Sequence, residues 1–263
     1  MRQPMAALSD YDSARYQRQM MIEGWGDEGQ ARLRSASVFI AGAGGLGSPV
    51  ATYLAVAGVG EIHICDADRV ELSNLNRQTL HRDSRIGEMK ALSAERTLKE
   101  LNPTIKVVAH CERLDADNVG RIVGSPDIVV GCLDNFETRF VLSSYCITRR
   151  IPFVHGAVSG MLGQATFLNP PETPCLRCIV PQVPPLGIPP VVGAIAGLIG
   201  TIQALEVLKY LTGVGTPLAG RLLIVDGGAM SFDEVVVGRL DSCPDCSGTG
   251  TAGGTPAGII SNL

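Results

Sequence analysis

At 263 residues with 45% hydrophobic content, the chain is long enough to bury a full core and to form one large α/β domain or two small ones. The net charge of −4 excludes a global positive field for nucleic acid, so any affinity for phosphate must come from local clusters of Arg and Lys. Residues 1–12 are polar and charged, without an apolar core of signal-peptide length, so we expect a cytoplasmic protein.

Short runs rich in Val and Ile alternate along the first 160 residues with amphipathic stretches of helix length. This alternation predicts an α/β protein with a mostly parallel sheet that helices cover on both faces. The predicted strands are residues 37–41, 61–66, 105–111, 127–133 and 152–156. The predicted helices are residues 46–57, 87–101, 115–123 and 136–149.

The pattern changes after residue 160. Strands are predicted at residues 163–168 and 222–226, with a long helix at 192–211 between them. Residues 232–237 alternate between apolar and polar side chains like an edge strand. We therefore expect the parallel sheet to be extended by a C-terminal antiparallel portion.

The longest apolar run, residues 191–202, is well short of a membrane span of about 20 residues, which favours a buried helix and no membrane. Its small residues, Gly193, Gly197 and Gly200, would let another backbone approach closely. That approach suits a tightly packed core or a subunit contact.

The expected domain organisation is a single domain over residues 1–247, with a nucleotide-binding part at about 35–160 and a second part at about 161–247. Residues 181–190 contain five prolines in ten positions, which excludes regular structure and predicts a mobile crossing loop. The Gly-rich residues 248–263 predict a flexible tail.

A glycine-rich motif runs from the first predicted strand into the first predicted helix, and Asp66 ends the next strand. The motif glycines are Gly42, Gly44, Gly45 and Gly47. This order is the nucleotide-binding fingerprint: glycines allow close backbone approach, the helix N-terminus attracts phosphate, and the acidic residue binds ribose. The motif suits NAD and ATP equally well.

Positive charge beyond Asp66 favours ATP, because attack on an α-phosphate needs cations that stabilise the transferring and leaving groups. Arg77 and Lys90 are the candidates. Lys90 lies in the first turn of a predicted helix, where the macrodipole disfavours a cation, so a bound anion explains it better than solvation does. A solvated surface lysine remains the alternative.

Asp134 follows the predicted strand 127–133, at the edge where open α/β sheets bind ligands. A carboxylate there could hold Mg²⁺, as in other nucleotide sites. It could equally cap the helix that follows.

Four of the eight cysteines form two Cys-x-x-Cys pairs. They are Cys175 with Cys178, and Cys243 with Cys246. Four thiolates at this spacing predict a structural Zn²⁺ site that clamps the C-terminal segment onto the body. A redox pair or an ordinary buried thiol pair would leave the second pair unexplained.

Together these motifs resemble the ThiF/MoeB/HesA family, which is related to the ubiquitin-activating enzymes, from about residue 16 to residue 246. The residues that carry the resemblance are Arg15-Tyr16-Gln17-Arg18-Gln19, the glycine motif, Asp66 and Asp68, Ser73-Asn74-Leu75-Asn76-Arg77-Gln78, Gly87 and Lys90, Asp134-Asn135 and the cysteine pairs.

The resemblance implies a Rossmann-like adenylation domain, typically a homodimer with Mg²⁺-ATP and structural Zn²⁺. It implies that ATP contacts come from Gly42, Gly44, Gly45, Gly47, Asp66, Asp68, Asn74, Arg77, Gln78, Lys90 and Asp134. Catalytic roles would fall to Arg77, Lys90, Asp134 and Arg18. Of these, Asp134 would bind Mg²⁺, and Arg18 would reach into the neighbouring subunit's site.

The reaction implied by the resemblance joins the C-terminal Gly of a small ubiquitin-like sulfur-carrier protein, ending in Gly-Gly, to the α-phosphate of ATP. Many relatives carry a cysteine in the crossing loop for covalent attachment of the carrier, but residues 181–190 contain none. We therefore expect adenylation only, with sulfur delivered by a separate protein. The sequence does not indicate which carrier or pathway is served.

Three other functions would also use a nucleotide-binding fold. An NAD-dependent oxidoreductase would use the same glycine motif, but it does not explain Arg77, Lys90 or the cysteine pairs. A nucleotide-binding scaffold without turnover is disfavoured by those cations together with Asp134. Adenylation of a tRNA base is disfavoured by the acidic balance and by the lack of a basic stripe.

Overall fold

The computed structural model describes residues 8–181 and 190–247. Its strands form one eight-stranded sheet in the order β3-β2-β1-β4-β5-β6-β7-β8. The first five strands pair in parallel and the last three join them antiparallel. The strands are β1 (Ser37–Ala41), β2 (Glu61–Cys65), β3 (Lys106–His110), β4 (Ile128–Gly131), β5 (Phe153–Ser159), β6 (Leu162–Leu168), β7 (Arg221–Asp226) and β8 (Ser231–Val236). The predicted fold class is confirmed.

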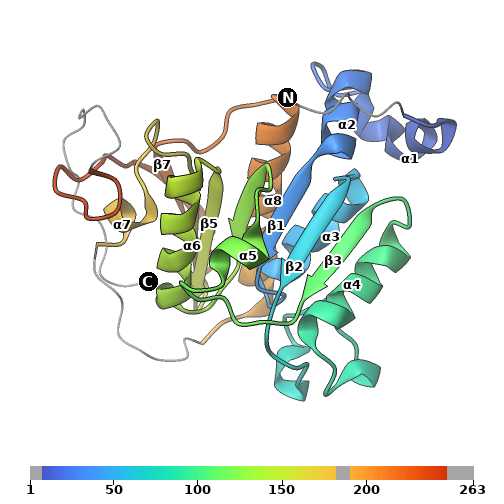
Figure 1. The fold of residues 1–263 in the computed structure, drawn as a ribbon, viewed down its shortest axis with the longest axis horizontal. Coiled ribbons are helices and arrows are strands. Elements are labelled where there is room, and N and C mark those ends of the chain that lie inside the picture. The colour runs from blue at the N-terminus through green and yellow to red at the C-terminus, as the bar shows by residue number, and fades with distance from the viewer. Residues whose placement is uncertain (1–7, 182–189, 248–263) are drawn as a thin grey trace.

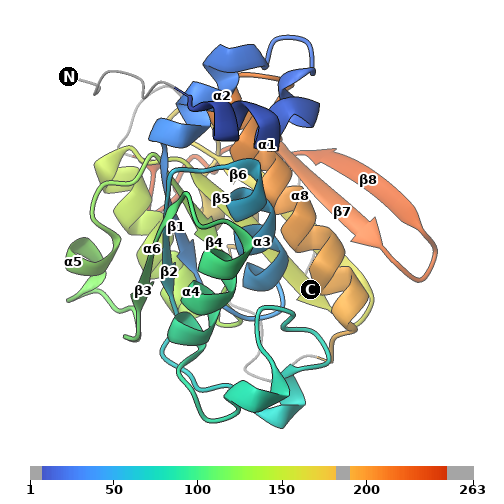
Figure 2. The same ribbon diagram turned by 90° about the vertical axis from the view of Figure 1, so that its right-hand side faces the viewer.

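Helices cover both faces of this sheet, and each face has its own apolar core (Figures 1 and 2). One face packs against α2 (Gly26–Ser35), α3 (Gly47–Ala57), α4 (Lys90–Leu101) and α8 (Gly193–Thr212). The other packs against α5 (Val119–Val123), α6 (Phe136–Arg149) and α7 (Leu176–Ile179). Strands β1 and β4 are buried on both sides, which explains their continuous apolar runs.

Helices α1 (Asp10–Met20) and α2 precede the sheet and were not predicted. Helix α1 is polar and buries only Asp12 and Tyr16, so it offers no apolar stripe for a sequence pattern to detect. Its start is fixed locally by a capping box between Ser9 and Asp12.

Two helices begin later than predicted. Helix α4 starts at Lys90 because the backbone of residues 87–89 turns back and pairs with the segment after β2: the N–H of Val70 donates to the carbonyl of Glu88 at 2.8 Å. Helix α5 starts at Val119 because the Asp115 carboxylate accepts two backbone N–H groups and forms a turn.

Helix α8 is long and apolar enough to cross a membrane, but it packs against α3, β5 and β6 as a core helix. Close backbone approach is confirmed at two of its glycines. A Cβ on Gly193 would lie 2.6 Å from the carbonyl oxygen of Asn76, and one on Gly200 would lie 2.5 Å from that of Leu46. A Cβ on Gly197 would meet no atom of the described chain within 4 Å, so Gly197 does not serve the packing of the core, and a subunit contact there stays a prediction.

Most of the predicted crossing loop at 181–190, and the predicted tail at 248–263, lie outside the described residues. The described C-terminal segment, 237–247, lies beside α7 (red and gold in Figure 1), where the two cysteine pairs meet.

Candidate functional site

The glycine motif forms a tight turn between β1 and α3. Gly42 has a φ of +103°, and a Cβ on it would lie 2.5 Å from the carbonyl oxygen of Cys132. A Cβ on Gly47 would lie 1.9 Å from the carbonyl oxygen of Gly42. Within the described residues the backbone N–H groups of Gly44 and Gly45 donate to no protein acceptor. The turn therefore presents two free donors at the N-terminus of α3, as phosphate binding requires.

Asp66 supports this turn from the end of β2. Its carboxylate accepts the N–H of Ala43 at 2.8 Å with one oxygen and the N–H of Asp68 at 2.9 Å with the other. Burial raises the pKa of Asp66 above its ordinary value, although the N–H of Ala43 and the charge of Lys90 act in the opposite direction. Each oxygen keeps a lone pair for a further donor, such as a ribose hydroxyl.

Lys90 is buried at the first position of α4, with 7% of its surface exposed. Its Nζ lies 3.1 Å from the Asp68 carboxylate, which is itself largely exposed. The interpretation of Lys90 as a solvated surface residue was therefore wrong. A buried ammonium at a helix N-terminus is electrostatically unfavourable, and a single exposed carboxylate balances it only in part.

The segment 72–78 places a cation and a buried amide against the glycine turn. The short helix η1 (Leu72–Asn74) is held by Asn74, whose side-chain oxygen accepts the N–H of Glu71 at 3.0 Å. The side chain of Arg77 passes Gly45, since a Cβ there would lie 3.5 Å from its Cγ. Gln78 is buried beside Gly44, and its Oε1 has no hydrogen-bond partner in the described residues. These groups fit a polar ligand seated on the turn.

Asp134 lies just beyond β4, next to β1 and its glycine turn. Helix α6 is capped by Asn135, whose side chain accepts the N–H of Thr138 at 2.9 Å. Asp134 is therefore not the capping residue, and its carboxylate is exposed. The alternative prediction, that Asp134 caps the helix, was therefore wrong.

Two buried residues near these loops carried no sequence signal. Arg139 donates from Nε to the Leu133 carbonyl at 3.0 Å and stacks over Phe136. His81 follows η1, precedes the short helix η2 (Asp83–Arg85), and contacts the Ala43 carbonyl at 3.0 Å. Each of these side chains binds a backbone carbonyl, a group that every residue has. No spacing of residue types in the sequence could therefore have revealed either contact.

Arg18 lies at the opposite end of the molecule from the glycine turn. Helix α1 contacts the C-terminal ends of α3 and α4: Gln19 donates to the Ala57 carbonyl at 2.8 Å, and Asn102 donates to the Tyr16 hydroxyl at 2.8 Å. The turn precedes the other end of α3, which is 11 residues, or about 16 Å, long. Figures 1 and 2 show α1 at the top and the segment between β2 and α4 at the bottom. Arg18 therefore does not join the site of its own chain.

The four paired cysteines converge as predicted. Their sulfurs all lie within 4.8 Å of one another, and Cys175 and Cys243 are 3.5 Å apart. Four sulfurs bound to Zn²⁺ at about 2.3 Å in a tetrahedron lie about 3.8 Å apart, so the cluster fits this ion. The N–H of Leu240 donates to the Cys178 sulfur at 3.4 Å, an interaction that favours its thiolate.

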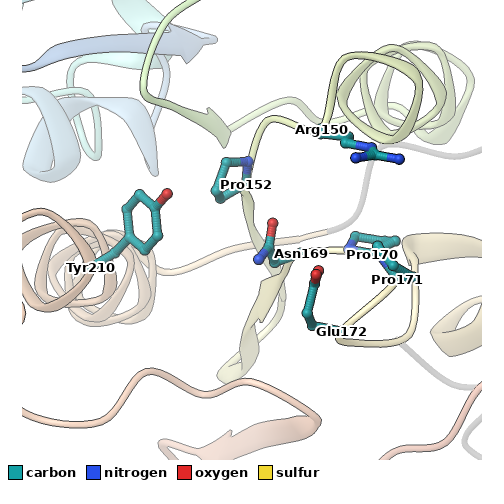
Figure 3. A pocket seen from close by; sticks show the side chains of 7 residues that line it. All are labelled: Arg150, Pro152, Asn169, Pro170, Pro171, Glu172 and Tyr210. Carbon is teal, nitrogen blue, oxygen red and sulfur yellow. The ribbon is translucent and has the colours of Figure 1, made fainter. Parts of the chain in front are cut away.

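A shallow pocket of about 310 Å³ lies away from these residues, at the C-terminal end of α6 (Figure 3). Arg150 and Tyr210 border it from opposite sides, with Asn169 and Glu172 between them. Asp134 precedes the other end of α6, a helix of 14 residues, or about 21 Å. The pocket is therefore separate from the candidate site.

Known proteins resemble this chain over nearly all of its described length. The model of the ThiF family matches residues 16–246. A sulfur carrier protein adenylyltransferase from Thermus thermophilus is 42% identical over 243 residues, which cover 88% of this chain and 90% of that protein. The adenylyltransferase and sulfurtransferase MOCS3 of Drosophila willistoni is 43% identical over 249 residues. That match covers 91% of this chain but 54% of MOCS3, so the chain spans about half the length of the MOCS3 relatives.

Solved structures agree with the fold. A crystal structure of E. coli MccB with MccA-N7isoASN superposes with a TM-score of 0.82 at 23% identity, over 91% of this chain and 75% of that chain. A structure of E. coli MccB with ATP gives a TM-score of 0.81 at 23% identity, over 91% and 76% of the two chains. Sequence and fold agree that this chain is a member of the ThiF family.

Proposed function

We propose that the protein is an ATP-dependent adenylyltransferase that activates the C-terminal Gly of a small ubiquitin-like sulfur-carrier protein. The observation that carries the proposal is the glycine turn, which presents the free N–H groups of Gly44 and Gly45 and which the Arg77 side chain passes at Gly45. The near full-length likeness to a sulfur carrier protein adenylyltransferase supports the same reaction.

In this reaction a carboxylate oxygen of the carrier attacks the α-phosphorus of ATP, and the bond from that phosphorus to pyrophosphate breaks. The nucleophile is already ionised at neutral pH, so it needs no general base, and catalysis consists of positioning and charge stabilisation. Arg77 and Lys90 would stabilise the charge on the phosphates. Asp134 would hold Mg²⁺, which would neutralise the leaving pyrophosphate.

The other ATP contacts follow from the placement of the turn. Asp66 is positioned for the ribose hydroxyls, and the buried Oε1 of Gln78 can accept a hydrogen bond from the nucleotide. Asp68 holds Lys90, and Asn74 shapes the loop that carries Arg77.

We propose that the active form is a homodimer in which Arg18 completes the site of the partner chain. The distance between α1 and the glycine turn supports this arrangement, because an Arg18 that acts in catalysis must act on another copy. Residues 1–247 would form a single adenylation domain in the cytoplasm, with Zn²⁺ in the cysteine cluster as a structural ion.

The absence of cysteine from residues 181–190 supports a chemistry that stops at the acyl-adenylate. Sulfur would then come from a separate donor protein. A carrier thioester or mixed disulfide on this chain would contradict that proposal.

ATP–pyrophosphate exchange with carriers that end in Gly-Gly tests the proposed function. We expect carrier-dependent and Mg²⁺-dependent exchange, and we expect Arg77→Ala or Asp134→Ala to abolish it while zinc content and folding persist. Asp117→Ala, which removes an exposed carboxylate that is not among the proposed ATP contacts, is the matched control and should leave exchange intact. No exchange with any carrier, together with tight NAD binding, would refute the proposal.

A further inference from the structure

His81 lies near the end of the loop between η1 and η2 and is almost fully enclosed, with 4% of its surface exposed. Its Nε2 lies 3.0 Å from the carbonyl oxygen of Ala43 in the glycine turn. Its Nδ1 lies 3.0 Å from the hydroxyl oxygen of Ser93 on α4. The imidazole therefore bridges the first turn of α4 and the glycine turn.

Only one assignment of protons suits the neutral ring. A carbonyl oxygen can only accept, so Nε2 must carry the hydrogen and donate it to Ala43. Nδ1 then accepts the hydroxyl hydrogen of Ser93. Burial lowers the pKa of His81 below its ordinary value, and the positive charges of Lys90, Arg85 and Arg82 lower it further, although the bond to the Ala43 carbonyl acts in the opposite direction, so the neutral ring is favoured.

The bond to Ala43 has a geometric consequence for the next residue. The carbonyl of Ala43 and the N–H of Gly44 belong to one planar trans peptide, in which these two groups point in opposite directions. Because the Ala43 carbonyl is fixed toward His81, the Gly44 N–H must point away from His81. That N–H has no acceptor in the described residues, and the N–H on the other side of Ala43 is held by Asp66.

We propose that His81 is a positioning residue that fixes the Ala43–Gly44 peptide and thereby aims the Gly44 N–H at a phosphate of the bound nucleotide. The identity of the nucleotide rests on the proposed function. The orientation of the peptide does not, because it is set within the nucleotide-free chain.

The first test is therefore made without ligand. In protein labelled with ¹⁵N at histidine, the imidazole resonances of nucleotide-free wild type should show the hydrogen of His81 on Nε2, with His81→Gln used to assign the signal. A hydrogen on Nδ1 alone would overturn the proposal, whatever the protein binds.

The second test compares two replacements of similar size. His81→Gln keeps an N–H donor, and His81→Leu removes it. We expect His81→Leu to weaken ATP binding about tenfold, because it leaves the buried Ala43 carbonyl unpaired and the peptide free to turn. We expect His81→Gln to stay within about threefold of wild type.

Adenosine, which has no phosphate, separates positioning from general damage to the site. Under the proposal adenosine binds the Leu variant as it binds wild type, while ATP binds it more weakly. Equal weakening of both ligands in His81→Leu, or ATP affinity unchanged from wild type, would overturn the proposal. Failure of wild type to bind ATP would count against the proposed function and leave the imidazole measurement standing.

Discussion

Gly42 lies in the turn before α3 and Gly197 lies inside α8, and replacing each with alanine should have opposite effects on stability. We predict that Gly42→Ala destabilises the protein by at least about 2 kcal/mol, because the φ of +103° and the backbone contact with Cys132 both disfavour a Cβ. Gly197→Ala should stabilise it by about 0.5–1 kcal/mol, since its Cβ meets nothing within 4 Å inside a helix. Urea denaturation of both variants measures this, and equal effects would contradict it.

The buried His155 on β5 should make the free energy of unfolding depend on pH. It is fully buried, and neither ring nitrogen has a protein partner among the described residues. Burial lowers its pKa well below the ordinary value of 6.5, so the folded chain leaves it neutral where the unfolded chain protonates it. The free energy of unfolding should therefore be full above pH 6.5 and should fall as the pH decreases below 6.5, by up to about 1.4 kcal/mol per pH unit for this group.

Denaturant titrations between pH 8 and pH 5 measure that slope. His155→Leu should flatten it, because leucine does not titrate and leaves no unpaired nitrogen in the core. His81, whose pKa is shifted in the same direction, should account for part of the slope that remains. An unchanged slope in His155→Leu would show that this histidine does not titrate on unfolding.

The residues that could be predicted from the sequence are those whose requirement is local or chemically distinctive. Gly42 and Gly47 follow from backbone geometry within one turn, and the cysteines from their own chemistry. His81 and Arg139 could not be predicted, because each binds a main-chain carbonyl, and carbonyls carry no sequence identity. Their partners are known only once the loops are placed together.

Among the elements, β1 to β5 and helices α3, α6 and α8 could be predicted to within a few residues, because each buries a continuous apolar run or face. Helix α1 could not, since its stability comes from a capping box and from Tyr16 packed against Asn102. The start of α4 was misplaced because the backbone of residues 87–89 bonds to a segment far along the chain. Non-local pairing of this kind is invisible to helical periodicity.

The segment 237–247 carries Cys243 and Cys246 and forms no α-helix or strand of the sheet or of its covering layers. We predict one Zn²⁺ per chain by elemental analysis, and its loss in the double variant Cys243→Ser, Cys246→Ser. That variant should become sensitive to proteolysis in this segment while the parallel sheet stays folded, because a bound ion would join the segment to Cys175 and Cys178. Cys111→Ser, outside the cluster, is the control, and zinc retained by the double variant would contradict the assignment.

For the whole molecule, the mostly parallel sheet and its two covering layers follow from the alternation of strands and helices, whereas the strand order is known only from the structure. The separation of Arg18 from the glycine turn does not follow from that alternation, because it depends on how α1 folds back over α3 and α4. Because Arg18 lies far from the glycine turn of its own chain, mixing two variant chains can test the proposed homodimer.

Mixing Arg18→Ala with Arg77→Ala chains should restore activity that neither variant has alone. In a mixed dimer one site carries both changes and the other carries none. If half of the dimers are mixed, the recovered exchange should be about a quarter of the wild-type level. Mixed dimers that form and yet stay inactive would show that Arg18 does not act across the interface.

The central claim is that the α-phosphate of ATP becomes attached to the carrier's C-terminal carboxylate. Incubation of the protein with a carrier ending in Gly-Gly and with ATP labelled at the α-phosphate tests it most directly. We predict that the α-label appears on the carrier as an acid-stable, hydroxylamine-sensitive adduct, whereas label at the γ-phosphate leaves as pyrophosphate. Carrier that stays unlabelled, or that takes up the γ-label, would contradict the claim.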